Sequence, residues 1–354
     1  MSRITRLLMV LTAAALLLAA CTPTPAAVSG GPVTLTVMTH DSFAISAELV
    51  TQFEQAHNAT LVFVPSGDTG AALNRAILSK EAPQADVFYG VDNTFLARAL
   101  QAGIFEPYAS PLLTDIPTSF QLDSENRALP VDYGDVCLNY DRAYFEDHNL
   151  PIPQTLADLA APEYAGLLVI ENPATSSPGL AFLMATIANF TEERYIDFWA
   201  DLRANGVVVV NDWETAYYTN FSGSSGRGPQ PLVVSYNSSP AAEYIFADPP
   251  VDEPPTGSIT APLACYRQIE FVGILAGTQQ RALAEQFVDF MLSVPFQEDV
   301  PEQMFVFPVN PNAKLPEAFE RFAPPAAQPA TLDPALVAEN RDRWIEEWTQ
   351  TVLR

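Results

Sequence analysis

The sequence contains few of the residues that most enzymes use for catalysis. Its 354 residues include only three histidines and three cysteines. The motifs H-E-x-x-H, C-x-x-C and G-x-S-x-G are absent, which argues against zinc proteases, dithiol oxidoreductases and α/β-hydrolases. His40, Asp41 and Ser42 are neighbours in the chain, whereas a catalytic triad needs residues that converge from separate segments. We therefore expect a protein that is not an enzyme and that uses no cofactor and no metal.

Basic residues are also scarce. The chain has 17 lysines and arginines against 42 aspartates and glutamates, a formal net charge of −25 at pH 7. Such a chain repels nucleic acid and anionic lipid, so we expect no nucleic-acid partner. It would tolerate or attract a cationic ligand. Solubility is the simpler explanation of the acidic balance, since it requires no particular ligand.

The first 21 residues have the pattern of an export signal. Arg3 and Arg6 precede the apolar run 7–20, which is too short to span a bilayer. Cys21 follows two alanines directly, which resembles the bacterial lipoprotein signal, in which the cysteine is acylated. The alternative is an ordinary signal peptide with a chance cysteine. Residues 22–32 are rich in Pro, Gly and Ser, which predicts a flexible tether between a lipid anchor and an extracytoplasmic domain.

The remaining chain of roughly 320 residues exceeds what one core usually accommodates, so two lobes are expected. Short apolar segments recur between loops and helical patterns, which favours a parallel sheet covered by helices. These strand candidates are residues 33–38, 61–64, 85–93, 166–170, 207–210 and 232–234, and residues 305–311 are expected to close the sheet as its last strand. Trp344 and Trp348 lie four residues apart in a C-terminal helix predicted over 334–353, and we expect them to belong to the core.

Residues 232–240 are the stretch with the clearest binding character. The apolar strand 232–234 is followed by Ser235, Tyr236, Asn237, Ser238 and Ser239, and then by a helical pattern. In α/β sheets, ligands bind outside the carboxyl ends of strands, where helix N-termini offer free N–H groups. The alternative is a Ser/Asn helix cap beside a core tyrosine.

Cys137 and Cys265 both lie in strand-like segments, which we expect to cross side by side between the lobes. An exported protein meets an oxidising compartment, so a Cys137–Cys265 disulfide is plausible. Two free buried thiols are the alternative.

These residues together resemble one known family, the thiamine-binding substrate-binding proteins of bacterial ABC importers. The resemblance covers nearly the whole mature chain, and the order and spacing of its motifs carry it rather than any single tripeptide. The motifs are Asp41-Ser42-Phe43, Asp68 with Leu73-Asn74-Arg75, Ala85-Asp86-Val87 with Gly90 and Asp92-Asn93, Asp132-Tyr133-Gly134, Thr175-Ser176 with Pro178-Gly179-Leu180, Trp213-Glu214 with Ala216-Tyr217, Ser235-Tyr236 with Ser239-Pro240-Ala241, Phe307-Pro308-Val309, Trp344-Ile345 and Glu347-Trp348.

The resemblance implies a periplasmic-binding-protein fold of type II, with two α/β lobes, mixed sheets covered by helices, and hinge strands between the lobes. The expected divisions are signal 1–21, tether 22–32, lobe one 33–131, lobe two 132–267, the return to lobe one 268–312, and a C-terminal wrap 313–354. The implied ligand residues are Asp68, Thr69, Ser176, Ser177, Trp213, Tyr217, Tyr236, Asn237, Ser238, Ser239 and Phe305. The implied partners are thiamine or its phosphates, an ABC permease, and the membrane through Cys21, with the protein acting as a monomer.

The sequence departs from the family pattern at three positions. Phe305 stands where a tryptophan is usual, and His40 where a tyrosine is usual. Tyr244 is out of register with the tyrosine that follows Ser-Pro-Ala in the family. These departures imply a looser pocket, or one shaped for a relative of thiamine. We expect His40 to be a solvent-edge or hydrogen-bonded residue rather than a ligand contact.

The chemistry of thiamine agrees with the implied residues. Aromatic faces attract its flat thiazolium cation, and Asp68 can accept from its exocyclic amine. Ser176 and Ser177, ahead of a helix, can donate to a hydroxyl or phosphate. In this interpretation the ligand binds the closed protein better and shifts the lobes towards closure.

Other ligands remain possible from the sequence alone. Related exported proteins bind ferric iron through adjacent tyrosines, and Tyr217-Tyr218 is such a pair. Tyr217 belongs to the Trp-Glu-x-Ala-Tyr pattern, which argues against iron. Polyamines also suit acidic and aromatic groups. A secreted enzyme or a purely structural lipoprotein is less consistent with the polar strand ends.

Overall fold

The computed structural model describes residues 31–225 and 227–354. The predicted signal segment, with Cys21, and most of the tether lie outside these residues. Residues Thr34–Arg354 form one compact unit. Among the described residues, no helix combines the length and apolar character needed to cross a bilayer.

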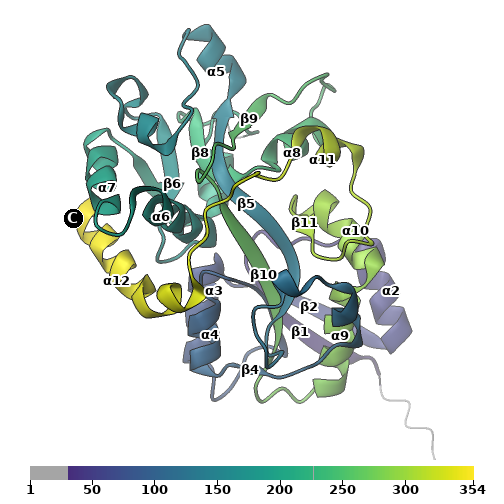
Figure 1. The fold of residues 1–354 in the computed structure, drawn as a ribbon. Coiled ribbons are helices and arrows are strands. Elements are labelled where there is room, and N and C mark those ends of the chain that lie inside the picture. The colour runs from purple at the N-terminus through teal and green to yellow at the C-terminus, as the bar shows by residue number, and fades with distance from the viewer. Residues whose placement is uncertain (1–30, 226) are drawn as a thin grey trace, which may run out of the picture. The chain divides into compact units, whose positions relative to one another are not determined.

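In the described part of the chain, eleven strands form one mixed sheet, whose arrangement can be followed in Figure 1. The strands are β1 (Val33–Thr39), β2 (Ala59–Pro65), β3 (Val87–Asp92), β4 (Phe105–Glu106), β5 (Leu129–Asp141), β6 (Leu168–Glu171), β7 (Val208–Val210), β8 (Leu232–Tyr236), β9 (Thr256–Ile259), β10 (Tyr266–Leu275) and β11 (Phe307–Pro308). The main order is β2-β1-β3-β10-β5-β8-β6-β7, with β9 and β11 paired to β5 and β4 paired to β10.

Strands β5 and β10 connect the two halves of this sheet. They pair antiparallel to each other, β10 pairs with β3 of the first half, and β5 pairs with β8 of the second. The parallel pairing predicted from the sequence holds for β1 with β3 and for β6 with β7 and β8. It fails at the two connecting strands, because they carry the chain in opposite directions between the halves. Cys137 and Cys265 are bonded beside this crossing, as expected, with Cα atoms 4.3 Å apart.

Helices cover both faces of the sheet. The α-helices are α2 (Ala47–His57), α3 (Thr69–Leu78), α4 (Leu96–Ala102), α5 (Arg142–Asp147), α6 (Ser177–Phe190), α7 (Tyr195–Ala204), α8 (Ser239–Ile245), α9 (Arg281–Leu292), α10 (Val294–Gln303), α11 (Glu317–Phe322) and α12 (Pro334–Val352). Short 3₁₀ turns are η1 (Pro111–Asp115), η2 (Thr118–Phe120), η3 (Leu156–Ala160) and η4 (Pro162–Tyr164), and η5 (Thr215–Asn220) is a π-helix.

Two apolar cores lie on opposite faces of the sheet because strand side chains alternate. Phe88 of β3 joins the core under α3, α4, α6, α7 and α12, whereas its neighbours Val87 and Tyr89 join the core under α2, α9 and α10. Figure 1 shows these two groups of helices on either side of the sheet. Trp344 and Trp348 are fully buried in the first core, which confirms that prediction.

The predicted last strand is much shorter in the structure. The sequence suggests residues 305–311, but β11 covers only Phe307–Pro308. Phe305 has a left-handed φ of 59°, so extended pairing cannot begin there, and Pro308 and Pro311 have no N–H to donate. This kink turns residues 304–306 towards the site described next. The fold class is thus the expected α/β sheet covered by helices, and the residue limits of the two lobes stay a prediction.

Candidate ligand-binding site

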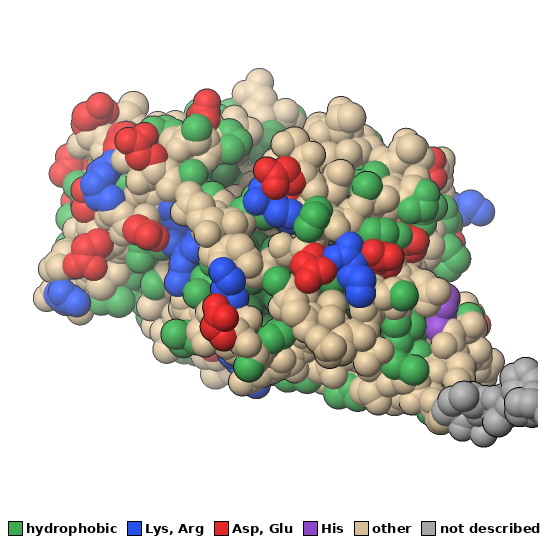
Figure 2. Space-filling model, turned by 90° about the horizontal axis from the view of Figure 1, so that it is seen from below, with side chains coloured by type: hydrophobic (Ala, Val, Ile, Leu, Met, Phe, Trp, Pro, Cys, Tyr) green, Lys and Arg blue, Asp and Glu red, His purple; other side chains and the backbone are tan. Residues whose placement is uncertain are grey.

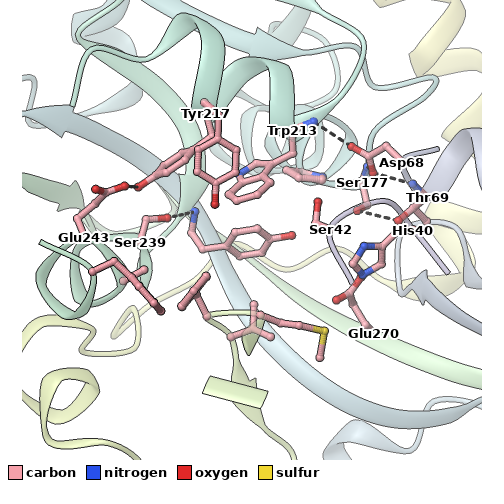
Figure 3. A pocket seen from close by; sticks show the side chains of 18 of the residues that line it. His40, Ser42, Asp68, Thr69, Ser177, Trp213, Tyr217, Ser239, Glu243 and Glu270 are labelled. Atoms are coloured by element: carbon pink, nitrogen blue, oxygen red, sulfur yellow. Dashed lines mark hydrogen bonds and ion pairs between the residues drawn. The ribbon is translucent and has the colours of Figure 1, made fainter. Parts of the chain in front are cut away.

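A cavity of about 350 Å³ opens at the strand ends on both sides of the connecting strands. Its walls come from the loops after β1, β2 and β7, from β8 and α8, from the start of α6, from β10, and from the segment before β11. The lining residues are His40, Ser42, Asp68, Thr69, Ser177, Pro178, Trp213, Tyr217, Tyr218, Ser225, Tyr236, Ser239, Ala242, Glu243, Phe246, Glu270, Met304, Phe305 and Val306. Figure 3 shows most of their side chains directed at one space.

The carboxylate of Asp68 accepts hydrogen bonds from backbone N–H groups of three separate segments. It is the N-cap of α3, where the N–H of Thr69 donates to its Oδ1 at 2.6 Å. The N–H of Ser177, at the start of α6, donates to the same oxygen at 3.4 Å, and the N–H of Trp213 donates to Oδ2 at 3.2 Å. Burial raises the pKa of Asp68, but these hydrogen bonds oppose the shift because they stabilise the ionised form.

A glycine lets this loop approach the second half of the protein closely. The N–H of Gly70 donates to the carbonyl of Thr175 at 2.9 Å. A Cβ at Gly70 would lie 2.7 Å from the carbonyl oxygen of Ala174, so a larger residue would push the two segments apart. The contact around Asp68 therefore depends on both its carboxylate and its glycine.

Aromatic rings form two walls of the cavity. Trp213 stacks on Tyr217, with centroids 5.0 Å apart and an interplanar angle of 17°. Tyr236 meets Trp213 at 64° with centroids 6.4 Å apart. The indole N–H of Trp213 donates to Ser235 Oγ at 2.9 Å, which fixes the orientation of the ring. A flat ligand between these walls would meet ring faces and edges on two sides.

A chain of side-chain hydrogen bonds runs under the aromatic walls. The hydroxyl of Tyr236 donates to Gln268 Oε1 at 3.1 Å, and Gln268 Nε2 donates to Ser177 Oγ at 3.1 Å. Ser177 Oγ is in turn hydrogen-bonded to Thr69 Oγ1 at 3.1 Å. Ser177 and Thr69 are thereby oriented by one another, with β10 supplying the link.

Acidic side chains lie at opposite ends of the cavity. Glu243 lies at one end, where the hydroxyl of Tyr217 donates to its Oε1 at 2.9 Å (Figure 3). Glu270 lies at the other end, with its Oε1 3.6 Å from His40 Nε2. Burial raises the pKa of both carboxyl groups, and that of Glu270 rises well above its usual value. Of residues 31–225 and 227–354, no lysine or arginine lines the cavity, so the formal charge of this lining is set by Asp68, Glu243 and Glu270.

His40 corrects one expectation from the sequence. Instead of lying at a solvent edge, its ring lines the cavity, and its side chain is only 13% exposed. Gly90 makes room for it, since a Cβ there would lie 2.4 Å from His40 Cδ2. Burial lowers the pKa of His40 to about 4, so the ring is neutral at pH 7.

The structure brings eight of the eleven predicted ligand residues to the cavity. They are Asp68, Thr69, Ser177, Trp213, Tyr217, Tyr236, Ser239 and Phe305. The other three lie behind the wall. Ser176 is fully buried ahead of α6, the side-chain amide of Asn237 donates to the carbonyl of Pro324 at 2.8 Å, and the hydroxyl of Ser238 donates to the carbonyl of Phe305. Ser238 and Asn237 thus position the wall rather than line it.

Several lining residues were missed from the sequence, chiefly Glu270, Glu243 and Met304. Glu270 had a usable signal, because a lone carboxylate within the apolar strand Ile269–Val272 is costly unless it is paired or protonated. Glu243 had none, since glutamate is a common residue inside helices. Met304 comes to the cavity through the backbone turn at Phe305, which no periodicity predicts.

Several basic residues on the protein surface are paired with acidic residues, whereas the described cavity lining has acidic residues without lysine or arginine. On the face in Figure 2, Lys and Arg lie next to Asp and Glu. Arg281 pairs with Glu106 and Glu285 in this way, and Arg267 pairs with Asp135. Among the residues that the structure describes, no group of three or more His, Cys, Asp or Glu could hold a metal ion. An unpaired cation from solution is therefore the ligand type that this cavity suits best.

Comparisons with known proteins agree with this geometry. Residues 82–333 match the family described as bacterial extracellular solute-binding protein. The thiamine-binding periplasmic protein of Escherichia coli (strain K12) is 32% identical over 331 residues, covering 90% of this chain and 94% of that protein. The protein of the same name from Brucella suis biovar 1 (strain 1330) is 29% identical over 328 residues, covering 91% and 92%.

Solved structures show the same similarity. A periplasmic thiamin binding protein superposes with a TM-score of 0.79 at 28% identity, covering 91% of this chain and 97% of that one. A ferric binding protein from Campylobacter jejuni superposes with a TM-score of 0.72 at 16% identity, covering 90% and 99%. The second match shows the fold alone, so it carries no information about the ligand.

Proposed function

Since this chain belongs to the family of bacterial extracellular solute-binding proteins, we propose that it captures thiamine and delivers it to an ABC permease. The similarity to thiamine-binding periplasmic proteins covers nine-tenths of the chain and supports an extracytoplasmic location. Acylation of Cys21 would hold the protein, as a monomer, at a membrane. That anchor is part of the proposal and rests on the sequence pattern of residues 3–21.

One observation carries the choice of ligand, namely an aromatic cavity whose lining, in the described part of the chain, has carboxylates but no lysine or arginine. Thiamine is a flat molecule with a permanent positive charge on its thiazolium ring. Each aromatic face is expected to contribute on the order of 0.5–2 kcal/mol to binding such a cation. Trp213 and Tyr236 present rings on two sides of the cavity, and the carboxylates supply the compensating charge.

Asp68 is the proposed acceptor for the exocyclic amine of the pyrimidine ring. Its two oxygens already accept from three backbone N–H groups, which fixes the position of the carboxylate. Each carboxylate oxygen has two acceptor positions, so capacity for a ligand N–H remains. Ser177 and Ser239, which line the same cavity, are the proposed partners of the hydroxyl end.

The contacts of Asp68 also support closure of the two expected lobes on the ligand. Residues 68–70 belong to the expected first lobe, and they bond to Thr175, Ser177 and Trp213 of the second. We propose that these contacts form in the closed state and that the ligand favours this state because it touches both sides. Small-angle scattering should show compaction when thiamine is added. No compaction at saturating thiamine would remove closure from the proposal.

Calorimetry with a panel of ligands tests the function itself. Thiamine, its mono- and diphosphate, spermidine and Fe(III) would each be titrated into the purified mature protein. We expect saturable one-to-one binding of thiamine. Tight binding of spermidine or Fe(III) without binding of thiamine would refute the proposal. For iron, the hydroxyl of Tyr217 would first have to leave Glu243, to which it donates at 2.9 Å.

A further inference from the structure

A cluster of ionisable groups lies at the Glu270 end of the cavity, where strands β3, β10 and β5 are neighbours in the sheet. In the sheet, Glu270 of β10 is opposite Asp132 of β5 on one side and opposite Asp92 of β3 on the other. The hydroxyl of Tyr89 lies 2.5 Å from Asp132 Oδ2 and 3.2 Å from Glu270 Oε2. Glu270 lines the cavity, whereas Asp132, 1% exposed, does not.

The geometry around Tyr89 implies a second proton in the cluster. A phenol has one proton to donate, yet two carboxyl oxygens lie within hydrogen-bond distance of it. The shorter contact fits donation from Tyr89 to an ionised Asp132. The longer contact is favourable only if Glu270 carries a proton of its own, since an ionised Glu270 would be an acceptor with no donor there.

Among the described residues that face Glu270, none carries a positive charge at pH 7 that would stabilise its ionised form. The groups that face it are His40 from the loop after β1, Tyr89 and Asp92 from β3, Asp132 from β5, and Tyr236 from β8. His40 Nε2 and Asp132 Oδ1 are buried without a hydrogen-bond partner among the described residues. Burial and the neighbouring Asp132 raise the pKa of Glu270 well above its usual value, and burial raises that of Asp132 to about 6.

We propose that Glu270 is the carboxylate that faces the positive charge of the ligand, and that a cationic ligand binds in exchange for the proton that Glu270 shares with Asp132. This inference rests on the proposed function, because it requires a cationic ligand in this cavity. The proton leaves Glu270 for solvent as the ligand enters, so the charge of the filled site differs little from that of the empty one. Glu270 thereby selects for cations, because a neutral ligand cannot replace the proton.

The exchange of a proton for the ligand determines whether ligand affinity rises or falls with pH. Binding that releases a proton becomes stronger as pH rises, by at most tenfold per pH unit for one proton. The dependence flattens above the pKa of Glu270 in the empty protein, where no proton remains to be released. Below about pH 4 the neutral ring of His40 also becomes charged, which opposes the cation further.

Calorimetry with thiamine in buffers of different ionisation enthalpy counts the protons directly. At about pH 6 to 7 we expect the wild-type protein to release close to one proton per thiamine bound. Glu270→Gln should abolish this release and weaken binding. Asp132→Asn is the matched partner, since it removes the neighbouring negative charge without altering the cavity wall. We expect it to bind thiamine with a smaller proton release than wild type, because burial still raises the pKa of Glu270 but Asp132 no longer adds to that shift.

Each outcome separates this inference from the proposed function. If wild-type protein binds thiamine with no proton release, the exchange is wrong and the thiamine function stands. If Glu270→Gln releases as many protons as wild type, they come from another group and the assignment to Glu270 is wrong. If thiamine does not bind at any pH, the proposed function itself fails. The wild-type measurement decides the first and last outcomes even if a variant does not fold.

Discussion

Asp68 and Glu270 line one cavity, yet their surroundings differ in kind. Three backbone N–H groups point at Asp68, and every hydrogen bond to it opposes the effect of burial on its pKa. Around Glu270, the neighbouring Asp132 and Asp92 add to the effect of burial instead. The comparison shows that the neighbours of a carboxylate decide whether it holds a charge or a proton. We expect Asp68 to be a fixed charge and Glu270 an exchangeable one.

The comparison also predicts that substitutions of Asp68 and of Glu270 will change stability and ligand affinity differently. Removing Asp68 leaves three donors without an acceptor, and these donors lie in three segments that the carboxylate joins. Glu270 already carries a proton in the empty protein, so Glu270→Gln removes a negative charge only from the filled site. Substitution of Asp68 should therefore lower both the stability of the protein and its affinity for the ligand. Substitution of Glu270 should lower only the affinity.

The largest effect is expected for Asp68→Ala. Each buried N–H left without an acceptor costs about 1–3 kcal/mol. We expect a lower unfolding free energy and thiamine affinity reduced by about 100-fold or more, measured by denaturant titration and calorimetry. Asp41→Ala is the control, because Asp41 accepts only one N–H, that of Gly67, in an exposed loop. Equal losses in both variants would refute the special role of Asp68.

Trp213→Ala tests whether ligand binding beside Asp68 depends on the indole ring of Trp213 or on the backbone N–H of this residue. The substitution keeps the N–H that donates to Asp68 and removes only the aromatic face. We expect thiamine affinity to fall by about 10- to 100-fold, as the loss of one stacking and cation–π contact of roughly 1–3 kcal/mol predicts. Tyr144→Ala, at a ring that stacks on His148 outside the cavity, is the control. Unchanged affinity for Trp213→Ala would remove the ring from the site.

The pH dependence of stability probes the Glu270 end without any ligand. A carboxyl group whose pKa is raised by folding stabilises the protein less as pH rises above its unfolded value of about 4.5 and through its folded value. Glu270 and the fully buried Glu171 both have pKa values well above the usual range. We expect the unfolding free energy of the empty protein to decrease between about pH 5 and 8, by up to 1.4 kcal/mol per pH unit per group.

Urea titrations at several pH values would measure this slope. Glu270→Gln should make it shallower, because one of the contributing groups no longer titrates. A steeper slope in the variant, or a wild-type stability that increases with pH over this range, would contradict the assignment of the proton to Glu270.

The smallest effect is expected for Phe305→Trp, which changes neither carboxylate. Phe305 packs edge-on against Phe246, with centroids 5.4 Å apart, and Phe246 is 64% exposed. A larger ring there would extend the aromatic lining into open space, so we expect thiamine to bind about two- to fivefold more tightly. Calorimetry should find the proton release unchanged. A change in proton release would show that the aromatic lining at Phe305 influences the protonation of Glu270.

Much of the site could be predicted where the relevant residues are close in sequence. Asp68 and Thr69 follow β2 after a short turn and begin α3, and Ser177 begins α6, so local patterns are enough to bring these residues to the cavity. Ser176, Asn237 and Ser238 belong to the same patterns but point elsewhere, because successive residues at a strand end or helix start face different directions. The patterns therefore locate segments better than they select side chains.

The sequence by itself determined the two connecting strands, the buried tryptophans of α12, the α/β class and the acidic balance of the chain, because periodicity and composition are local properties. Only the tertiary structure decided which acids meet. Asp132 and Glu270 are 138 positions apart in the chain and become neighbours because the pairing of β5 with β10 sets them opposite each other. Protonation depends on distance and burial, and neither is defined until the strands have paired.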